Sequence, residues 1–346
     1  MVVASYLVTA TLPLPGFVNS HSHAFQRALR GRAAGTDFWT WREGMLEEAD
    51  LATPTSIRAS YTNVYREMLS AGYTAVGEFH YLGLAEAFAA AEAAAEAGIA
   101  IVLLHAAYER GGLARMRQPS VAAYLSEVEA LRAAGVAVGL APHSVRACSR
   151  KWLEEIGRYA GAEGLPLHIH ADEQPREIEE CLEEHGHRPI ELLADAGCLT
   201  RETTVIHATH ANDAELDLMA AAGSRICVCP TTEADLGDGF LRVTAIRERG
   251  IPLCIGSDSN MRIDPLEELR EIEGIARRQT GARGILSTGD LFEIGSAEGG
   301  RALHLDVWAT IEIDLGHRSL AGIAEEHVPA ALVAGCAADV VTWSRG

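Results

Sequence analysis

Two histidines one residue apart, His21 and His23, follow a short apolar segment near the start of the chain. Side chains two residues apart on a strand point the same way, so both imidazoles can reach one cation, and imidazole nitrogen suits zinc or iron. For an isolated pair of this kind, a polar strand end that faces solvent is the simpler interpretation. Further ligand-type residues are needed before the pair indicates a metal site.

The segment "HIHADEQ" supplies a third histidine, His170, at the end of another apolar run, with Glu173 three residues later. Asp258 in "IGSDSN" adds a carboxylate oxygen. Three imidazoles and one carboxylate around one ion leave a position for water, which is typical of catalytic zinc. The predicted metal ligands are His21, His23, His170 and Asp258, with zinc as the expected ion and ferrous iron as the alternative.

The predicted site is mononuclear. A second ion usually needs a bridging anionic ligand, often a carboxylated lysine on the fourth of the apolar runs that we interpret below as strands. The corresponding segment, "VAVGLAPH", has no lysine and no glutamate, and Lys151 is the only lysine of the chain. His168 shares a strand face with His170 but lies one pleat deeper, so we interpret it as a core or supporting histidine.

Eight short, continuous apolar runs alternate with helix-type segments, which is the pattern of parallel strands covered by helices. Eight such units over roughly 250 residues fit a closed (β/α)8 barrel, an α/β fold whose chemistry gathers at the C-terminal strand ends. Polar residues end most of the runs, whereas a doubly wound sheet would not spread His and Asp over so many strand ends. The predicted strands cover residues 15–20, 73–79, 99–105, 136–143, 165–170, 203–209, 225–230 and 251–259.

Composition narrows the class of protein. The chain has 346 residues, 48% of them hydrophobic, so it can bury a large core. Its net charge of −19 argues against general affinity for nucleic acid or an anionic membrane surface, and favours a small-molecule partner. No apolar run has the length of a spanning helix, so we expect a soluble, cytoplasmic protein. Seven cysteines without a CxxC pair predict reduced, mostly buried thiols.

The residues of the predicted site resemble those of the amidohydrolase superfamily, whose marks are HxH after the first barrel strand, histidine after the fifth and sixth, and aspartate after the eighth. His170 with Glu173, and the His207 of "VIHATH", are similar to the mononuclear deaminase branch of that superfamily, and within it to the formimidoylglutamate deiminases. The resembling segments come in family order: "NSHSHAFQRALRG", "FWTWRE", "GYTAVGEFHYL", "GLAPHSVRA", "HIHADEQ", "VIHATH", "CPTTEADLGDG" and "GSDSN".

The resemblance implies a zinc-dependent hydrolase that converts N-formimidoyl-L-glutamate to N-formyl-L-glutamate and ammonia in histidine breakdown. It implies that Glu173 protonates the imino nitrogen while His207 and Asp258 help to take the proton of the attacking water. The substrate contacts that it implies are Gln26, Arg42, Tyr81, His143 and Arg146. The two arginines also have a physical reason, because forked guanidinium donors pair well with the two carboxylates of a dianion.

We expect the barrel to span residues 15–307. The tail contains two β-type segments, "WATIEID" and "ADVVTW". Family members carry a small β-sandwich built from both chain ends, so residues 1–14 and 308–346 are interpreted as the remnant of such a sandwich. Whether the chain forms a homodimer is an open question at this point.

Two alternatives remain at this point. One is a deaminase of the same superfamily that acts on another small molecule, such as a nucleobase; it would need an aromatic clamp for a flat ring rather than two arginines. The other is a shortened paralogue that keeps the barrel and binds metal or ligand without turnover.

Overall fold

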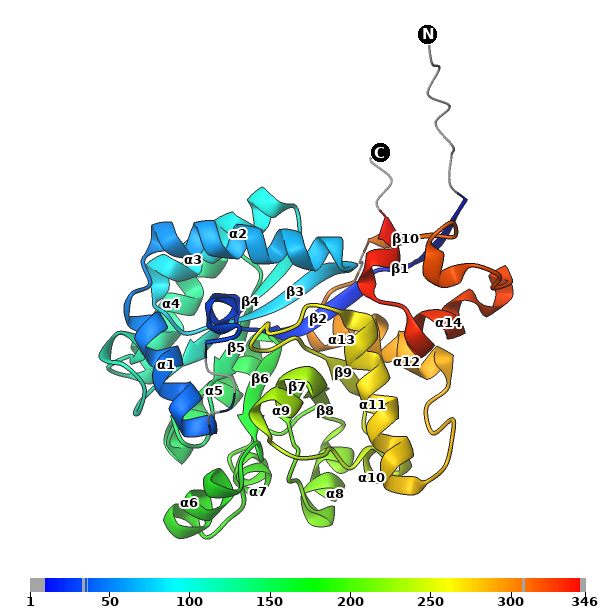
Figure 1. Ribbon diagram of the computed structural model, residues 1–346. Helices are drawn as coiled ribbons and strands as arrows, with labels where there is room; N and C mark the ends of the chain where they lie inside the picture. Colours follow the sequence, from blue (N-terminus) through cyan, green and yellow to red (C-terminus); the bar gives the residue numbers. More distant parts are fainter. Residues whose placement is uncertain (1–9, 33–34, 36, 307–308, 343–346) are drawn as a thin grey trace.

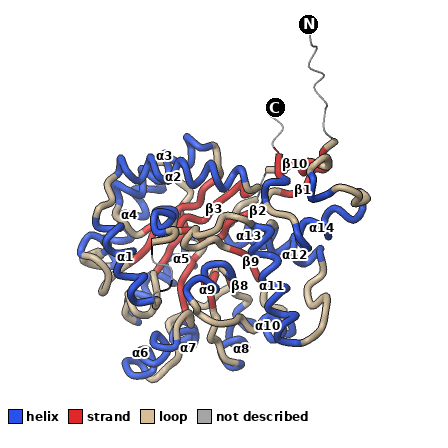
Figure 2. The backbone as a smooth tube through the Cα atoms, viewed as in Figure 1, coloured by secondary structure: helices blue, strands red, loops and turns tan. Residues whose placement is uncertain are grey.

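The centre of the computed structural model is a parallel eight-stranded sheet in which each strand pairs with the next along the chain. The structure describes residues 10–32, 35, 37–306 and 309–342. Helices lie around the strands, so the predicted (β/α)8 barrel is confirmed (Figures 1 and 2). The barrel strands are β2 (Phe17–Ser22), β3 (Tyr73–His80), β4 (Ala100–Ala107), β5 (Val138–Pro142), β6 (Leu167–Ala171), β7 (Thr203–His207), β8 (Arg225–Val228) and β9 (Leu253–Ile255).

The ring closes between β2 and the residues that follow β9. The amide of His23 donates to the carbonyl of Asp258 at 2.8 Å, and the amide of Asp258 donates to the carbonyl of His21 at 3.0 Å. Below these bonds, the side-chain oxygen of Asn19 accepts from the amide of Ser257 at 3.0 Å. Closure therefore brings the first and last strand ends, 235 residues apart in the chain (258 − 23), into direct contact.

The helices follow the strands in the order expected of a barrel. Helix α3 is rich in alanine, a strong helix former, and ends at Gly98, whose φ of 86° suits the left-handed C-terminal cap. The helices are α1 (Phe38–Asp50), α2 (Pro54–Ser70), α3 (Leu84–Ala97), α4 (Val121–Ala133), α5 (Arg150–Glu163), α6 (Pro175–His185), α7 (Pro189–Asp195), α8 (Asp213–Ala222), α9 (Pro230–Leu236), α10 (Val243–Glu248), α11 (Pro265–Thr280), α12 (Thr288–Gly295), α13 (Ala297–Ala302) and α14 (Val328–Gly335). Short 3₁₀ helices are η1 (Ala24–Leu29), η2 (Ala114–Met116), η3 (Arg318–Leu320), η4 (Glu325–His327) and η5 (Ala338–Val340).

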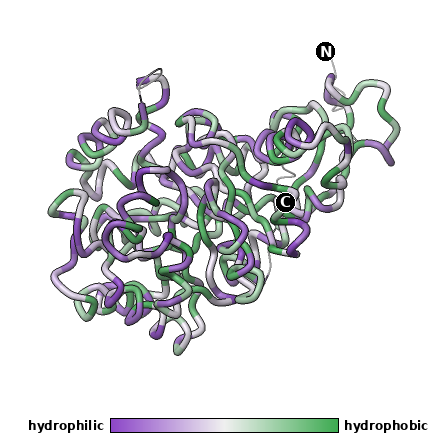
Figure 3. The backbone as a smooth tube through the Cα atoms, turned by 90° about the horizontal axis from the view of Figure 1, so that it is seen from below, coloured by the Kyte–Doolittle hydropathy of each residue, from purple (hydrophilic) through white to green (hydrophobic). Residues whose placement is uncertain are grey.

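The core lies along the strands. Every residue of β2, β3, β5, β6 and β7 is buried, as continuous apolar runs require when helices cover one side and the barrel interior the other. Hydrophobic segments run through the middle of the molecule, while much of the hydrophilic backbone lies toward its outer edge (Figure 3). All seven cysteines are buried, as predicted, and none lies in a disulfide within the described part of the chain.

The predicted strands are all present, but the first begins later than expected. Thr11–Pro15 forms a separate strand, β1, and the barrel strand starts at Phe17. Gly16 lies between the two, where a Cβ atom would be 2.6 Å from the carbonyl oxygen of Ala309. This close approach explains why the chain changes sheets at a glycine.

A small antiparallel sheet joins the two ends of the described chain. Strand β1 pairs with β10 (Thr310–Asp314), which pairs with β11 (Val341–Thr342). This sheet lies beside α14, at the edge of the barrel (Figure 1). Of the two predicted end segments, residues 1–9, 308 and 343–346 lie outside the described residues, as does 307 at the predicted barrel boundary. Their interpretation as the remnant of a larger sandwich stays a prediction.

Within the described ranges, no helix is long and apolar enough to cross a membrane.

Candidate active site

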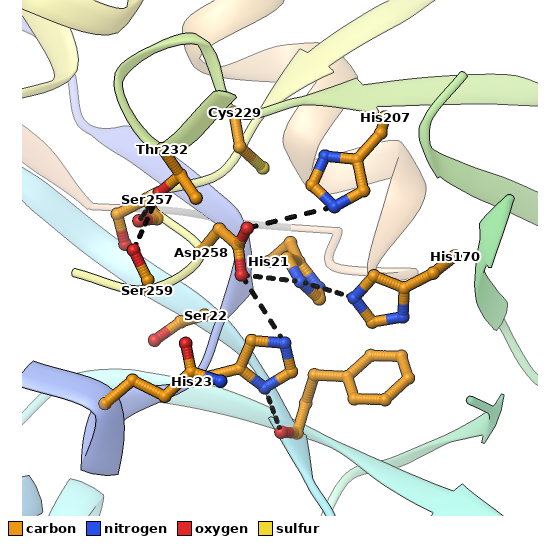
Figure 4. A network of polar contacts seen from close by, with 12 residues as sticks. His21, Ser22, His23, His170, His207, Cys229, Thr232, Ser257, Asp258 and Ser259 are labelled. Atoms are coloured by element: carbon orange, nitrogen blue, oxygen red, sulfur yellow. Dashed lines mark hydrogen bonds and ion pairs between the residues drawn. The ribbon is translucent and has the colours of Figure 1, made fainter. Parts of the chain in front are cut away.

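Four histidines and one aspartate from four strand ends face one another at the C-terminal end of the barrel (Figure 4). His21 lies in β2, His170 in β6 and His207 at the end of β7. His23 directly follows β2, and Asp258 follows β9. His207 and Asp258 have φ angles of 73° and 43°, in the left-handed region that side chains other than glycine rarely adopt. Such backbone conformations are typical of functional sites.

The distances among the predicted ligands fit a single metal ion. Nε2 of His21 lies 3.2 Å from Nε2 of His170 and 3.4 Å from Oδ1 of Asp258. Nε2 of His23 lies 3.5 Å from the same oxygen. Ligands bound to tetrahedral zinc at about 2.0–2.1 Å are separated by about 3.3 Å, so the donor atoms already have the spacing of a coordination shell. These side chains need to move little to hold an ion.

Hydrogen bonds behind two of these rings fix which nitrogen faces the centre. Nδ1 of His23 lies 2.9 Å from the carbonyl oxygen of Phe79, and Nδ1 of His170 lies 3.0 Å from that of His143. A carbonyl only accepts, so each Nδ1 must carry the hydrogen, and each Nε2 then presents a lone pair. Supporting contacts of this kind are the usual companions of metal-ligating histidines.

Burial sets the charge of the ligand histidines. Burial lowers the pKa of His21 to about 3, and it also lowers the pKa of His23. The pKa of His170 is held well below its ordinary value by burial and by the neighbouring His143 and His21 rings. Neutral imidazole is the form that binds a metal. Burial opposes ionisation of Asp258, yet the adjacent imidazoles keep the pKa of this carboxyl below its usual value.

His207 differs from these three histidines. Its Nε2 lies 3.8 Å from Oε1 of Glu173 and 3.8 Å from Oδ2 of Asp258. Burial alone would lower the pKa of His207, but the surrounding carboxylates, those of Glu173, Glu233 and Asp258, outweigh burial and raise it to about 10. Opposite shifts thus separate a proton-carrying histidine from the neutral ligand set, as expected in a catalytic site.

Glu173 and Arg146 are in direct contact. A guanidinium nitrogen of Arg146, Nη2, donates to Oε2 of Glu173 at 3.2 Å. Nε of Arg146 also lies 3.5 Å from the buried carboxylate of Glu177, which accepts the backbone amide of Glu173 at 3.1 Å. The predicted substrate arginine is therefore paired with the predicted proton donor.

A cavity of about 240 Å³ opens above the cluster. Gln26 and Tyr81 meet in its wall, where the Gln26 amide donates to the Tyr81 hydroxyl at 2.8 Å. Oε1 of Gln26 is buried and has no hydrogen-bond partner within the described part of the chain, so it can accept from a ligand. The predicted residues that line the cavity are His23, Gln26, Arg42, Tyr81, His143, Arg146, His170, Glu173, His207 and Asp258.

Two predicted residues take other positions. His21 does not line the cavity; it is completely buried beneath it. Arg42 reaches the cavity from α1, and its side chain is 31% exposed. Its Nη1 lies 3.7 Å from Oε1 of Glu43. His168 hydrogen-bonds the carbonyl of Ala302 at 2.8 Å, away from the cluster, in keeping with its interpretation as a core residue.

Several residues of the site have no individual role predicted from the sequence. Tyr108 and Trp41 line the cavity, Glu177 pairs with Arg146, and Glu233 lies 3.3 Å from Nδ1 of His207. Trp41 and Glu233 fall within two of the resembling segments, "FWTWRE" and "CPTTEADLGDG", which was the available signal. Tyr108 and Glu177 had no comparable signal.

Comparison with known proteins agrees with this geometry. The model of the amidohydrolase family matches residues 12–311, which includes every barrel strand and all the predicted site residues. The chain belongs to the amidohydrolase family.

Individual amidohydrolases similar to this chain differ in their reported activity. It is 39% identical over 290 residues to the formimidoylglutamate deiminase of Pseudomonas aeruginosa, which covers 75% of this chain and 63% of that protein. The chain thus spans less than two thirds of that relative's length. It is 30% identical to the 5-methylthioadenosine/S-adenosylhomocysteine deaminase of Halobacterium salinarum, over 85% of this chain and 69% of that one. A crystal structure of an amidohydrolase from Brucella melitensis superimposes with a TM-score of 0.83 at 31% identity, over 95% of this chain and 84% of that chain.

Proposed function

We propose that this amidohydrolase hydrolyses the formimidoyl C=N bond of N-formimidoyl-L-glutamate, giving N-formyl-L-glutamate and ammonia. The observation that carries the proposal is the position of two arginines, Arg42 and Arg146, in the wall of the cavity that opens over the His/Asp cluster. The wall has two further arginines, Arg110 and Arg176, which pair with Glu184 and Glu180. In a protein with a net charge of −19, two guanidinium groups beside a metal-type site favour a small dianion. The similarity to a formimidoylglutamate deiminase supports the same substrate.

The residues that would hold the metal are His21, His23, His170 and Asp258, whose donor atoms have the required spacing. Zinc suits three imidazoles and one carboxylate, and ferrous iron is the alternative. A bound zinc ion would supply Lewis acidity that makes water a nucleophile near neutral pH.

The remaining steps use groups of this chain. Water adds its oxygen to the formimidoyl carbon, and Glu173 delivers a proton to the imino nitrogen. Asp258 and His207 pass on the two protons that the water gives up: one goes to the same nitrogen and lets the C–N bond break, and the other returns to Glu173 and restores its acid form. His207 already carries a proton, so it takes one from the water only as it gives its own away. The nitrogen leaves as ammonia, the carbon becomes a formyl group, and both transferred protons come from the one water consumed.

Other groups of the cavity wall would orient the substrate. Arg42 and Arg146 would pair with its two carboxylates. The free Oε1 of Gln26 would accept an N–H of the amidine, while Tyr81 and His143 complete the wall. Positioning of this kind contributes several kcal/mol to catalysis, on the order of 7 kcal/mol in well-oriented systems.

Aromatic residues in the same cavity favour a second candidate, deamination of an adenosine-type ring. Trp41, Tyr81 and Tyr108 line it and offer flat surfaces for a base. The similarity to a 5-methylthioadenosine/S-adenosylhomocysteine deaminase points the same way.

Ammonia release from a panel of substrates separates the two candidates. Purified, zinc-loaded protein is given N-formimidoyl-L-glutamate, N-formimidoyl-L-aspartate and 5-methylthioadenosine in parallel. The proposal predicts rapid release from the glutamate derivative and little from the nucleoside. Release from 5-methylthioadenosine alone would overturn it in favour of the second candidate, and release from none would favour a chain without turnover.

A further inference from the structure

A buried carboxylate that the proposed mechanism does not use lies behind His207. Glu233 is in the first turn of α9 and is 2% exposed. Its Oε1 lies 3.3 Å from Nδ1 of His207 and accepts the backbone amide of Cys229 at 2.9 Å. Its Oε2 has no hydrogen-bond partner among the described residues. Glu233 belongs to "CPTTEADLGDG", one of the segments that resemble the family, but the proposed function assigns Glu233 no role.

The contact determines how the imidazole of His207 is used. A carboxylate facing Nδ1 requires that this nitrogen carry a hydrogen, and the ring then has only Nε2 free for the cavity. That nitrogen lies between two site carboxylates, those of Glu173 and Asp258, at 3.8 Å from each. With Nδ1 unpaired, the ring could turn about its bond to Cβ or exchange the two nitrogens.

We propose that Glu233 is a positioning residue, which holds the His207 ring by its Nδ1–H so that Nε2 faces the reacting atoms. This inference rests on the proposed function, because it deepens the role of His207 in that mechanism. Glu233 acts through His207 and does not reach the substrate itself, since it is absent from the wall of the cavity.

A purely structural role for Glu233 is the competing explanation. Its bond to the amide of Cys229, the residue that precedes α9, also caps this helix. Glu268 of α11 provides a matched control for that role. It is fully buried, and it accepts from the amide and the hydroxyl of Thr231 at 3.0 and 2.5 Å, in the same turn of α9. These bonds stabilise the helix without involving His207.

The test compares E233A and E233Q with E268A and E268Q. Glutamine keeps an oxygen where both His207 and Cys229 can donate to it, whereas alanine removes the acceptor. We expect E233A to lower kcat by about 100-fold and E233Q by about 10-fold, with KM within about threefold and zinc content unchanged. The two Glu268 variants should lower the melting temperature but keep kcat within about threefold of the parent.

Some results would overturn the proposal. They are a kcat for E233A within about threefold of the parent, equal losses of kcat in E268A and E233A, or a change confined to KM. The variants are assayed with whichever substrate of the panel releases ammonia, so the result does not depend on the glutamate derivative.

A second measurement needs no turnover, and its deciding observation is made on the parent protein rather than on E233A. The ring nitrogens of histidine are labelled with ¹⁵N in the parent protein, and the His207 signals are assigned by their loss in H207Q. In the parent protein, Nδ1 of His207 should carry a hydrogen. In E233A, where that variant folds, the signal of a protonated Nδ1 should weaken or disappear. A bare Nδ1 in the parent protein would contradict the proposal, even if the substrate assignment were correct.

Discussion

At the scale of single residues, the pair formed by Glu173 and Arg146 determines how chemistry and recognition are linked. The Nη2 of Arg146 donates to Glu173 at 3.2 Å, and Glu177 approaches the same guanidinium at 3.5 Å. A substrate carboxylate that binds Arg146 would share the guanidinium with Glu173 and weaken its pull on that side chain, which makes Glu173 easier to protonate as a proton donor. Recognition of the carboxylate should therefore affect the rate as well as the affinity.

Replacing the proton donor tests its role. E173Q removes the acidic proton but keeps the size of the side chain, and Glu173 is not among the predicted metal ligands. We expect kcat to fall by about 10³-fold or more while zinc content stays at the parent level, as measured by ammonia release and metal analysis. E183Q, at an exposed position of the following helix, α6, serves as the control. Substantial turnover by E173Q would exclude the role proposed for Glu173.

Replacing Arg146 tests recognition. R146A removes a charge-assisted pair with the substrate, worth about 2–3 kcal/mol, so kcat/KM for N-formimidoyl-L-glutamate should fall by about 100-fold. An amidine without carboxylates, such as N-butylformamidine, makes no such pair with Arg146, so its hydrolysis should change little. Equal losses for both substrates would mean that Arg146 serves only to hold Glu173.

At the scale of elements, closure of the barrel holds the proposed metal ligands in register. Asp258 exchanges backbone bonds with His21 and His23, while Asn260 donates to the hydroxyl of Ser22 at 3.1 Å and to the carbonyl of Asp258 at 2.9 Å. These contacts tie the loop after β9 to β2. The strained φ of Asp258 is sustained by these bonds.

Closure leaves little space at Gly256. A Cβ atom there would lie 2.7 Å from the carbonyl oxygen and 2.8 Å from the Cβ of His21. G256A should therefore displace His21, lowering the free energy of unfolding by about 1–3 kcal/mol and the zinc affinity by about 10–100-fold. Urea denaturation and competitive zinc titration measure the two effects.

Gly161 gives the matched control for this substitution. It lies in α5 with open space around it, so G161A should leave zinc affinity unchanged and stabilise the helix by up to about 1 kcal/mol. A G256A protein that matched G161A in both measurements would show that the closure tolerates a side chain.

Periodicity predicted the elements well because each barrel strand is buried on both sides and therefore reads as an unbroken apolar run. The same pattern could not separate β1 from β2, because the change of sheet at Gly16 depends on the close approach of Ala309 from the other end of the chain. The histidines of the cluster could be picked out from the sequence since they end strands. Tyr108 and Glu177 could not, because the loop after β4 brings Tyr108 to the cavity and α6 brings Glu177 to Arg146 by tertiary packing.

At the scale of the whole molecule, the small sheet formed by β1, β10 and β11 ties both ends of the described chain to the barrel. The barrel carries the ligands, the proton-handling groups and the cavity, so the proposed chemistry needs no residue from that sheet. Although the protein is acidic overall, Arg42 and Arg146 lie in the cavity wall where a dianion would bind.

One measurement tests this account most directly: ammonia release from N-formimidoyl-L-glutamate while metal-free protein is titrated with zinc. The single ligand set predicts a rate that rises in proportion to zinc and levels off at one equivalent per chain. Absence of ammonia at every zinc level, or a rate that keeps rising to two equivalents, would contradict the account.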